Sequence, residues 1–360
     1  RYENCESCPW DSGKDFMDIP FRKPDLADRE IINRFLAKQN TRSCEYTFAN
    51  IYLWSRHYPV EYAVVEDMAV FKTRDEENVF AFPMGDEKNL RACVDALTGW
   101  CREREIPLRF HSITEEQFAM LDAAYPGRFQ VEYDRDAADY VYEREKLATL
   151  SGKKYHGKKN HVNKFIRLYP DWSYEPIAPE NVEECFQMAL MWRRANGCEE
   201  DPEKNDEMCV TLNALRLFSE LHLQGGLLRA GGRIVAFSIG EPVSGDTFVV
   251  HIEKALSEVE GAYTMINQQF VIHETEGFQY VNREDDTGDP GLRKAKESYR
   301  PVFLVQKGTV TERDAASAAP VKGRGCPEAG GKACPLGGAN PAETCPVYKN
   351  SGNEDNGRTA

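Results

Sequence analysis

Apolar residues recur at helical spacing in the first part of the chain. Residues 90–101 carry them at i, i+4, i+7 and i+11, which predicts an amphipathic helix. Thr114 and Gln117 form a capping box, which predicts that another helix begins there. Two further helices are expected over 24–38 and 46–54. Strands are predicted in the segments rich in β-branched and aromatic residues, which are 60–66, 68–72, 79–83, 107–111, 129–133 and 139–145.

The second part of the chain repeats this order of elements. Two helices, 182–190 and 215–221, precede strands expected over the ranges 225–230, 233–241 and 247–254. The remaining predicted elements are a helix from 261, a strand over 279–284, a short helix over 290–300 and a strand over 302–310. Since no residue-level identity accompanies the repeat, we interpret it as a repeat of architecture only.

This order predicts an α/β fold with mixed sheets, divided into two tandem domains. The expected boundaries are 16–148 for the first domain and 149–312 for the second. Residues 1–15 are expected to be disordered. The tail at 313–360 is rich in Cys, Pro and Gly and loses hydrophobic periodicity, so it is expected to be disordered as well.

Composition and charge narrow the choice of partners. The chain has 360 residues, of which 41% are hydrophobic, so two sizeable cores can be buried. Its net charge of −14 excludes general affinity for nucleic acid or anionic lipid, and any polyanion must meet a local basic patch. No apolar run reaches the ~20 residues of a membrane span and no secretory signal is present. We therefore expect a cytoplasmic protein without a transmembrane segment.

The cysteines predict no metal site. Six of the eleven lie within periodic segments, as expected for reduced thiols in the cytoplasm. Cys5 and Cys8 have the spacing of half a zinc site, but Cys326, Cys334 and Cys345 in the tail fit no zinc knuckle.

The short helix expected over 290–300 is the first candidate site. Asp289 is a favourable N-cap and Pro301 limits the helix length. Its apolar residues, Leu292, Ala295 and Tyr299, are expected to pack inward. Its cations Arg293, Lys296 and Arg300 are expected to form a neighbouring polar stripe.

An acidic stretch, Glu284, Asp285 and Asp286, precedes this helix at the end of a predicted strand. Carboxylates that face a basic stripe at such an edge can activate an amine and hold a phosphate. Alternatively, the cations only complement the C-terminus of the helix and the carboxylates are solvated.

A run of cations without any acidic residue occupies 153–167. It contains Lys153, Lys154, Lys158, Lys159, Lys164 and Arg167, and its later part has one apolar helical face. Phosphate contacts of a nucleic acid are the usual role of such a face. The alternative is a solvated helix whose lysines keep it soluble.

A third candidate lies between a predicted strand and the helix that follows it. Glu253 ends the strand, and Gly261, Ala262, Tyr263 and Thr264 begin the helix. Free N–H groups at a helix start can bind a phosphate or carboxylate of a cofactor, and glycine permits a close approach. Glu253 is either a general base or a paired carboxylate at the strand end.

Three motifs together resemble a family of bacterial proteins named for the phosphatidylglycerol lysyltransferase C-terminal domain. They are Gly-Lys-Lys-x-His-Val-Asn-Lys-Phe at 157–165, Tyr-Thr-Phe-Ala-Asn-Ile-Tyr-Leu-Trp at 46–54 and Gly-Leu-Arg-Lys-Ala-Lys-x-Ser-Tyr-x-Pro at 291–301. The resemblance covers about residues 16–312. It implies two tandem acyltransferase domains of the GNAT type, as in lysylphosphatidylglycerol synthases and Fem aminoacyltransferases.

The resemblance also implies an activity. These relatives transfer an aminoacyl group from charged tRNA to an amine or hydroxyl, without acetyl-CoA. Lys296 then corresponds to a lysine that faces the tRNA end, and 153–167 to a helix that faces the nucleic acid. The sequence shows no counterpart of the membrane flippase part of lipid-modifying members. The acceptor therefore stays open among a small molecule, a peptide and a lipid headgroup.

The sequence thus predicts an aminoacyl- or acyltransferase. Its catalytic residues are expected to be Glu253, Asp285, Asp286 and Lys296. Its donor is expected to contact Gly261, Ala262, Tyr263, Thr264, Arg293, Tyr299 and Arg300. Aminoacyl-tRNA and acyl-CoA are both candidate donors. The alternative is a non-catalytic module of the same fold that binds RNA or a phosphorylated ligand.

Overall fold

The structure, a computed structural model, describes residues 18–74 and 77–313, which form one compact unit. The terminal cysteines of the sequence analysis lie outside these residues. Two sheets are present among the described residues, one of three strands in the order β1-β2-β3 and one of eight in the order β4-β11-β5-β10-β9-β8-β7-β6. The predicted α/β fold is therefore confirmed.

Over residues 18–74 and 77–143, the structure has five strands and four α-helices. The elements are α1 Arg29–Leu36, α2 Phe48–Trp54, β1 Val60–Val65, β2 Met68–Thr73, β3 Met84–Gly85, α3 Leu90–Glu103, β4 Arg109–Ile113, α4 Glu115–Ala124 and β5 Phe129–Glu143. The capping box of Thr114 and Gln117 is present at the start of α4. The strand predicted over 79–83 is wrong, because Phe80 makes only isolated bridges there. The two strands predicted over 129–145 are one continuous strand, β5.

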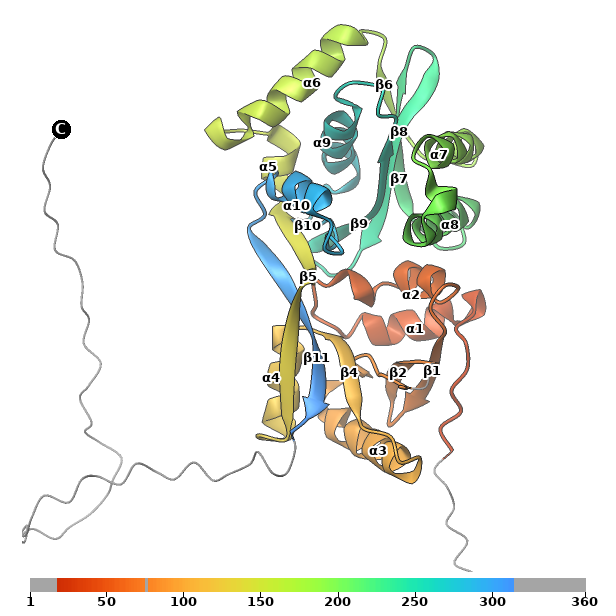
Figure 1. Cartoon of the computed structure of the whole chain (residues 1–360), viewed down its shortest axis with the longest axis vertical. Helices are drawn as coiled ribbons and strands as arrows, with labels where there is room; N and C mark the ends of the chain where they lie inside the picture. Colours follow the sequence, from red (N-terminus) through yellow and green to blue (C-terminus); the bar gives the residue numbers. More distant parts are fainter. Residues whose placement is uncertain (1–17, 75–76, 314–360) are drawn as a thin grey trace, which may run out of the picture. The chain divides into compact units, whose positions relative to one another are not determined.

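Over residues 144–313, the structure has six strands and six α-helices. They are α5 Arg144–Thr149, α6 His156–Leu168, β6 Ser173–Pro176, α7 Val182–Ala195, α8 Pro202–Arg216, β7 Gln224–Ala230, β8 Arg233–Pro242, β9 Thr247–Ala255, α9 Ala262–Glu274, β10 Tyr280–Asn282, α10 Pro290–Glu297 and β11 Phe303–Glu312. Helix α9 packs on one face of β7, β8 and β9, and α7 packs on the other (Figure 1).

The large sheet joins the two parts of the chain. Strand β11 inserts between β4 and β5, so that Phe303 pairs with Val141 and Gly308 with Ile113. Strand β10 pairs with β5 on one side and runs parallel to β9 on the other. One continuous sheet therefore contains strands from both sides of residue 148. The division of the chain into two domains at that residue stays a prediction.

A small apolar cluster lies under the region where β9 and β10 meet. Phe248 of β9, Val281 of β10 and Phe270 of α9 are almost completely buried in it, together with Tyr142 and Tyr299. Burial of such side chains contributes roughly 1.5–3 kcal/mol each, which fixes the two strands against α9. Within the described residues, none of the helices has the length and apolar character needed to span a bilayer.

Candidate functional site

The carboxyl ends of β9 and β10 form the candidate site. The two strands are parallel over three pairs, from Tyr280 opposite Thr247 to Asn282 opposite Val249. Beyond these pairs, side chains rather than backbone bonds connect the strands. Arg283 donates to Glu253 at 2.8 Å, and Nδ1 of His251 lies 2.7 Å from a carboxylate oxygen of Glu284. Ligands of α/β proteins commonly bind where parallel strands end in this way.

Glu253 is paired rather than free. Its Oε1 accepts the bond from Arg283, and its Oε2 accepts a hydrogen bond from the side-chain amide of Asn267 at 3.0 Å. Both the Glu253 and the Arg283 side chains are only 12% exposed. The carboxylate therefore serves as the counter-ion of Arg283 in this arrangement.

Two buried polar atoms beside this ion pair have no hydrogen-bond partner among the described residues. They are Nη1 of Arg283 and Oδ1 of Asn267. A buried group without a partner costs free energy, and in a functional site it is the expected state of a group that binds a ligand. Nη1 of Arg283 is thus available as a hydrogen-bond donor, and Oδ1 of Asn267 as an acceptor, for an incoming molecule.

Lys158 of α6 reaches the same place. Its Nζ lies 3.8 Å from the centre of the Tyr299 ring, and the Arg283 guanidinium lies 4.7 Å from that ring. Thr264 at the start of α9 lies near the Tyr299 hydroxyl and favours its ionised form, but burial outweighs this and raises the pKa of Tyr299. Burial, reinforced by the Arg283 charge, lowers the pKa of Lys158 to about 8. We call Lys158, Glu253, Thr264, Asn267, Arg283 and Tyr299 the β9–β10 site.

Lys296 does not lie on a polar stripe. The Lys296 side chain is buried, whereas Leu292 and Ala295 are exposed, so the predicted inward face of α10 is wrong except for Tyr299. Its Nζ donates to the backbone carbonyl oxygens of Arg283, at 2.7 Å, and of Asp285. These carbonyls satisfy an ammonium that has few other ways to be solvated. Lys296 therefore fixes the backbone that carries Arg283.

Asp286 holds the acidic loop together. The carboxylate is completely buried, and it accepts bonds from Arg293 at 2.7 and 2.8 Å and from the backbone N–H of Gly288 at 3.0 Å. The Tyr140 hydroxyl also donates to it. The bonds from Arg293 hold the pKa of Asp286 well below its usual range. With all these partners, Asp286 and Arg293 serve the structure of the loop.

Asp285 turns towards another buried cation. Its Oδ2 lies 3.4 Å from Nζ of Lys307, which also lies 2.8 Å from Asp139 and 3.2 Å from Glu45. Burial raises the pKa of Asp285 to about 6. The Lys307 ammonium also lies 3.7 Å from the thiol of Cys44, and the whole group joins the first part of the chain to β11.

His251 lies between two carboxylates. Its Nε2 is 3.1 Å from Glu241, opposite the contact of Nδ1 with Glu284. Burial opposes a charge on the ring, but the hydrogen bonds to Glu241 and Glu284 raise the pKa of His251 to about 10. The imidazolium thus links β8, β9 and the acidic loop.

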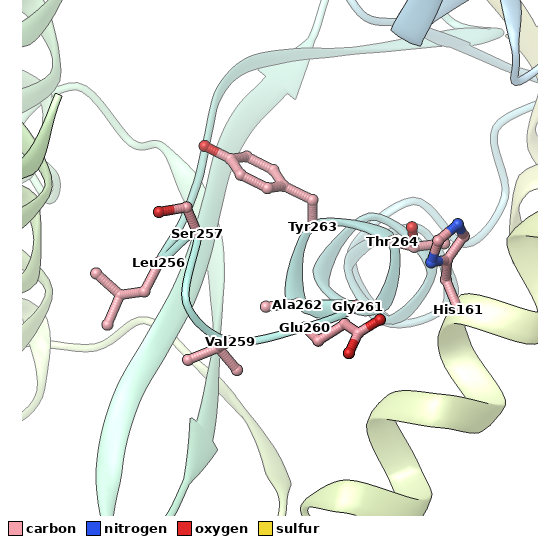
Figure 2. A pocket seen from close by; sticks show the side chains of 9 residues that line it. All are labelled: His161, Leu256, Ser257, Val259, Glu260, Gly261, Ala262, Tyr263 and Thr264. Atoms are coloured by element: carbon pink, nitrogen blue, oxygen red, sulfur yellow. The ribbon is translucent and has the colours of Figure 1, made fainter.

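The start of α9 is close to α6. Gly261 has φ +84°, and a Cβ built on it would lie 2.7 Å from the carbonyl oxygen of His161. The loop before the helix borders a hollow of about 270 Å³ (Figure 2). Its lining residues are His161, Leu256, Ser257, Val259, Glu260, Gly261, Ala262, Tyr263 and Thr264. The backbone N–H of Ala262, which lines the hollow, donates to the carbonyl oxygen of Val259. The Tyr263 hydroxyl accepts a hydrogen bond from the indole N–H of Trp192.

The predicted basic run divides into three groups. Lys153, Lys154, Lys159 and Arg167 are exposed. Lys164 pairs with Glu260 beside the hollow, and Lys158 turns to the β9–β10 site. Arg300 is exposed beyond the end of α10 with φ +59°, so the predicted stripe of Arg293, Lys296 and Arg300 is not brought together.

Sequence reasoning missed Arg283, His251, Asn267, Lys307 and Asp139. Their common signal is a charged or amide side chain within an otherwise apolar strand or helix face. Such residues are rarely buried without a partner, so the pattern indicates a buried polar network even where the partners are unknown. No group of three or more potential metal ligands is present in the part of the chain that the structure describes.

Comparison with known proteins identifies the family. The sequence model of the family described as "Phosphatidylglycerol lysyltransferase, C-terminal" matches residues 37–307. The chain belongs to this family. The predicted resemblance is therefore confirmed, and the chain is an acyltransferase.

Several solved structures share the fold of this chain. A conserved protein of unknown function from Bacteroides thetaiotaomicron is 38% identical with a TM-score of 0.77, over 82% of this chain and 100% of that one. The L-PGS of Bacillus licheniformis shares the fold, at 15% identity and a TM-score of 0.56 over 82% and 94% of the two chains. So does the C-terminal domain of an Agrobacterium fabrum protein described as a lysylphosphatidylglycerol synthetase, at 13% identity and 0.59 over 81% and 94%.

A curated relative, an uncharacterized protein of Mycoplasmoides gallisepticum, is 24% identical over 186 residues. The match covers 50% of this chain and 58% of that protein, so the chain spans less than two thirds of its length.

Proposed function

We propose that this acyltransferase moves an aminoacyl group from the ester of a charged tRNA to an amine or hydroxyl acceptor at the β9–β10 site. One observation carries the proposal. Helix α6 presents Lys159 and Arg167 to solvent, while Lys158 of the same helix reaches Tyr299 and Arg283. A polyanion held along the outer side of α6 would therefore have its end close to the buried donor and acceptor atoms.

The chemistry of such a transfer suits these residues. An aminoacyl ester is already activated, so positioning and charge stabilisation supply most of the catalysis. The free Nη1 of Arg283 is suited to stabilise the negative oxygen that develops when the acceptor attacks the ester carbonyl. Glu253 and Lys296 act through Arg283, one as its counter-ion and one by fixing its backbone carbonyl.

Acyl-CoA is the second candidate donor, because the hollow beside the start of α9 could take an anion. Two features disfavour it. Glu260 lines the hollow, and its carboxylate would repel a pyrophosphate unless Lys164 compensates it. The carbonyl oxygen of His161 also lies against Gly261, where a phosphate would need room. The closest approach of a phosphate to the helix start is therefore restricted.

A transfer assay separates the two donors. Total bacterial tRNA is charged with labelled amino acids and incubated with the protein and with lipid, peptide or small-molecule fractions as acceptors. Movement of label from tRNA into a product of one fraction is expected, together with no transfer from labelled acetyl-CoA. Transfer from acetyl-CoA alone would contradict the proposal.

Binding of tRNA has its own test. Lys154→Glu with Lys159→Glu should weaken tRNA binding about tenfold or more and reduce the slope of log K against log salt by about 2. The control is Lys23→Glu with Lys88→Glu, which changes the charge equally at two exposed lysines far along the chain. Equal affinity of the two double variants would show that α6 is only a solvated surface.

A further inference from the structure

We propose that Lys158 is the catalytic base of this site, which takes the proton that the acceptor loses as it attacks. The proposal rests on the proposed transfer and adds a residue to it. Neither a hydrogen bond nor an ion pair engages the Lys158 amine among the described residues. Its Nζ lies over the face of the Tyr299 ring, 3.8 Å from the ring centre. An amine in this position keeps a lone pair available once it is neutral.

Burial and the charge of Arg283 favour the neutral amine of Lys158, whereas the face of the Tyr299 ring and Glu253 favour the ammonium. The side chain is half-buried, so its charge loses part of its hydration. From the ends of β9 and β10 it faces Arg283, whose charge repels it, and Glu253, whose charge attracts it. One carboxylate oxygen of Glu253 accepts a hydrogen bond from Arg283 and the other accepts one from Asn267. The charge of Glu253 therefore stabilises the Lys158 ammonium less than a carboxylate without these partners would.

Two buried tyrosines beside the site stay neutral. Tyr299, which follows α10, has its pKa raised by burial, and Tyr142 of β5 has its pKa raised by burial as well. On α6 and just before it, Lys154, Lys159 and His161 are exposed to solvent, where water and salt screen their charges. Arg283 and Glu253 are therefore the charges that control the proton affinity of Lys158.

The transfer breaks one bond to the carbonyl carbon for each bond that it forms. The nitrogen or oxygen of the acceptor forms a bond to the ester carbonyl carbon, and its proton passes to Nζ of Lys158. The carbonyl oxygen becomes negative beside Nη1 of Arg283 and then returns its electrons as the bond to the 3′ oxygen of the tRNA breaks. The ammonium of Lys158 supplies the proton that the departing 3′ oxygen takes up.

The first measurement needs no substrate. Trace acetic anhydride is applied to the full protein at a series of pH values, and the acetylation of each lysine is quantified by mass spectrometry. Lys158 is expected to show a midpoint near pH 8, and Lys159, its exposed neighbour, is followed in the same samples as the control. A midpoint for Lys158 equal to that of Lys159 would overturn the assignment, whatever the donor is.

The second measurement follows transfer. Lys158→Ala should lower kcat by roughly a hundredfold or more, with partial rescue by added ethylamine, and wild-type rates should fall at pH values below about 8. Lys158→Arg keeps the positive charge but accepts no proton, so it should stay inactive, whereas Lys88→Ala, at an exposed lysine outside the site, should retain its kcat.

Full activity of Lys158→Arg would instead assign the residue to anion binding and overturn the proposal. The two hypotheses also fail differently. If wild-type protein transfers nothing from charged tRNA while Lys158 titrates near pH 8, the proposed donor is wrong, and the role of Lys158 in this transfer is wrong with it. If transfer occurs and Lys158→Ala is fully active, only the base is wrong.

Discussion

The ammonium of Lys296 donates a hydrogen bond to the backbone carbonyl oxygen of Arg283, at 2.7 Å. The two residues lie on separate elements, one on α10 and one just after β10. The sequence predicts that Lys296 lies on the surface of a short helix. Instead, its side chain is buried and fixes the backbone of Arg283, which faces the candidate site.

Replacement of Lys296 should therefore destabilise the protein. Lys296→Ala removes a buried, charge-assisted donor from two backbone carbonyls, and we expect the free energy of unfolding to fall by about 2–4 kcal/mol. Urea denaturation checks this, with Lys294→Ala on the exposed side of α10 as the control. Equal stability of the two variants would instead place Lys296 on the polar surface stripe that the sequence predicts.

The ion pair of Glu253 and Arg283 should show strong coupling. Glu253→Leu leaves a buried guanidinium without its counter-ion, which should cost about 3–5 kcal/mol of unfolding free energy. Arg283→Met should cost a similar amount. The double variant should lose much less than the sum of the two, because it leaves no buried charge uncompensated. Additive losses in a denaturation double-mutant cycle would show that the two charges are independently solvated.

Stability should depend on His251 at alkaline pH. The pKa of His251 is raised from 6.5 to about 10, because Glu241 and Glu284 outweigh the effect of burial. The stabilisation is therefore fully present below about pH 6.5 and is lost as the pH rises towards 10. His251→Gln should be less stable than wild type by roughly 2–4 kcal/mol at pH 6, and this difference should shrink by pH 10. Melting curves across this range test it, and a constant difference would exclude a charged ring.

Gly261 and Gly277 form a matched pair. Both have positive φ, +84° and +89°, so alanine at either position costs about 1–2 kcal/mol of backbone strain. Only at Gly261 does the new Cβ also meet the His161 carbonyl, at 2.7 Å, whereas nothing lies within 4 Å at Gly277. Gly261→Ala should therefore lower the melting temperature several degrees further than Gly277→Ala. Equal effects would mean that α6 can move away from α9.

Local patterns in the sequence were sufficient for most elements. The hairpin strands β7 and β8, the capping box before α4 and the N-cap of α10 follow from residues adjacent in the chain, and the structure has all of them. The family was also identifiable from three local motifs. Local signals work here because helices and turns are stabilised by groups only a few residues apart.

Contacts between distant residues were decided only by the tertiary structure. The sequence could not place β11 between β4 and β5, nor turn Lys296 inward while leaving Leu292 exposed. It named Glu253, Tyr299, Thr264 and Lys158 as separate candidates, but their assembly around Arg283 requires four different elements to meet. Whether a charged side chain is solvated or buried depends on such partners, because burial is affordable only where another part of the chain supplies the compensating charge or carbonyl.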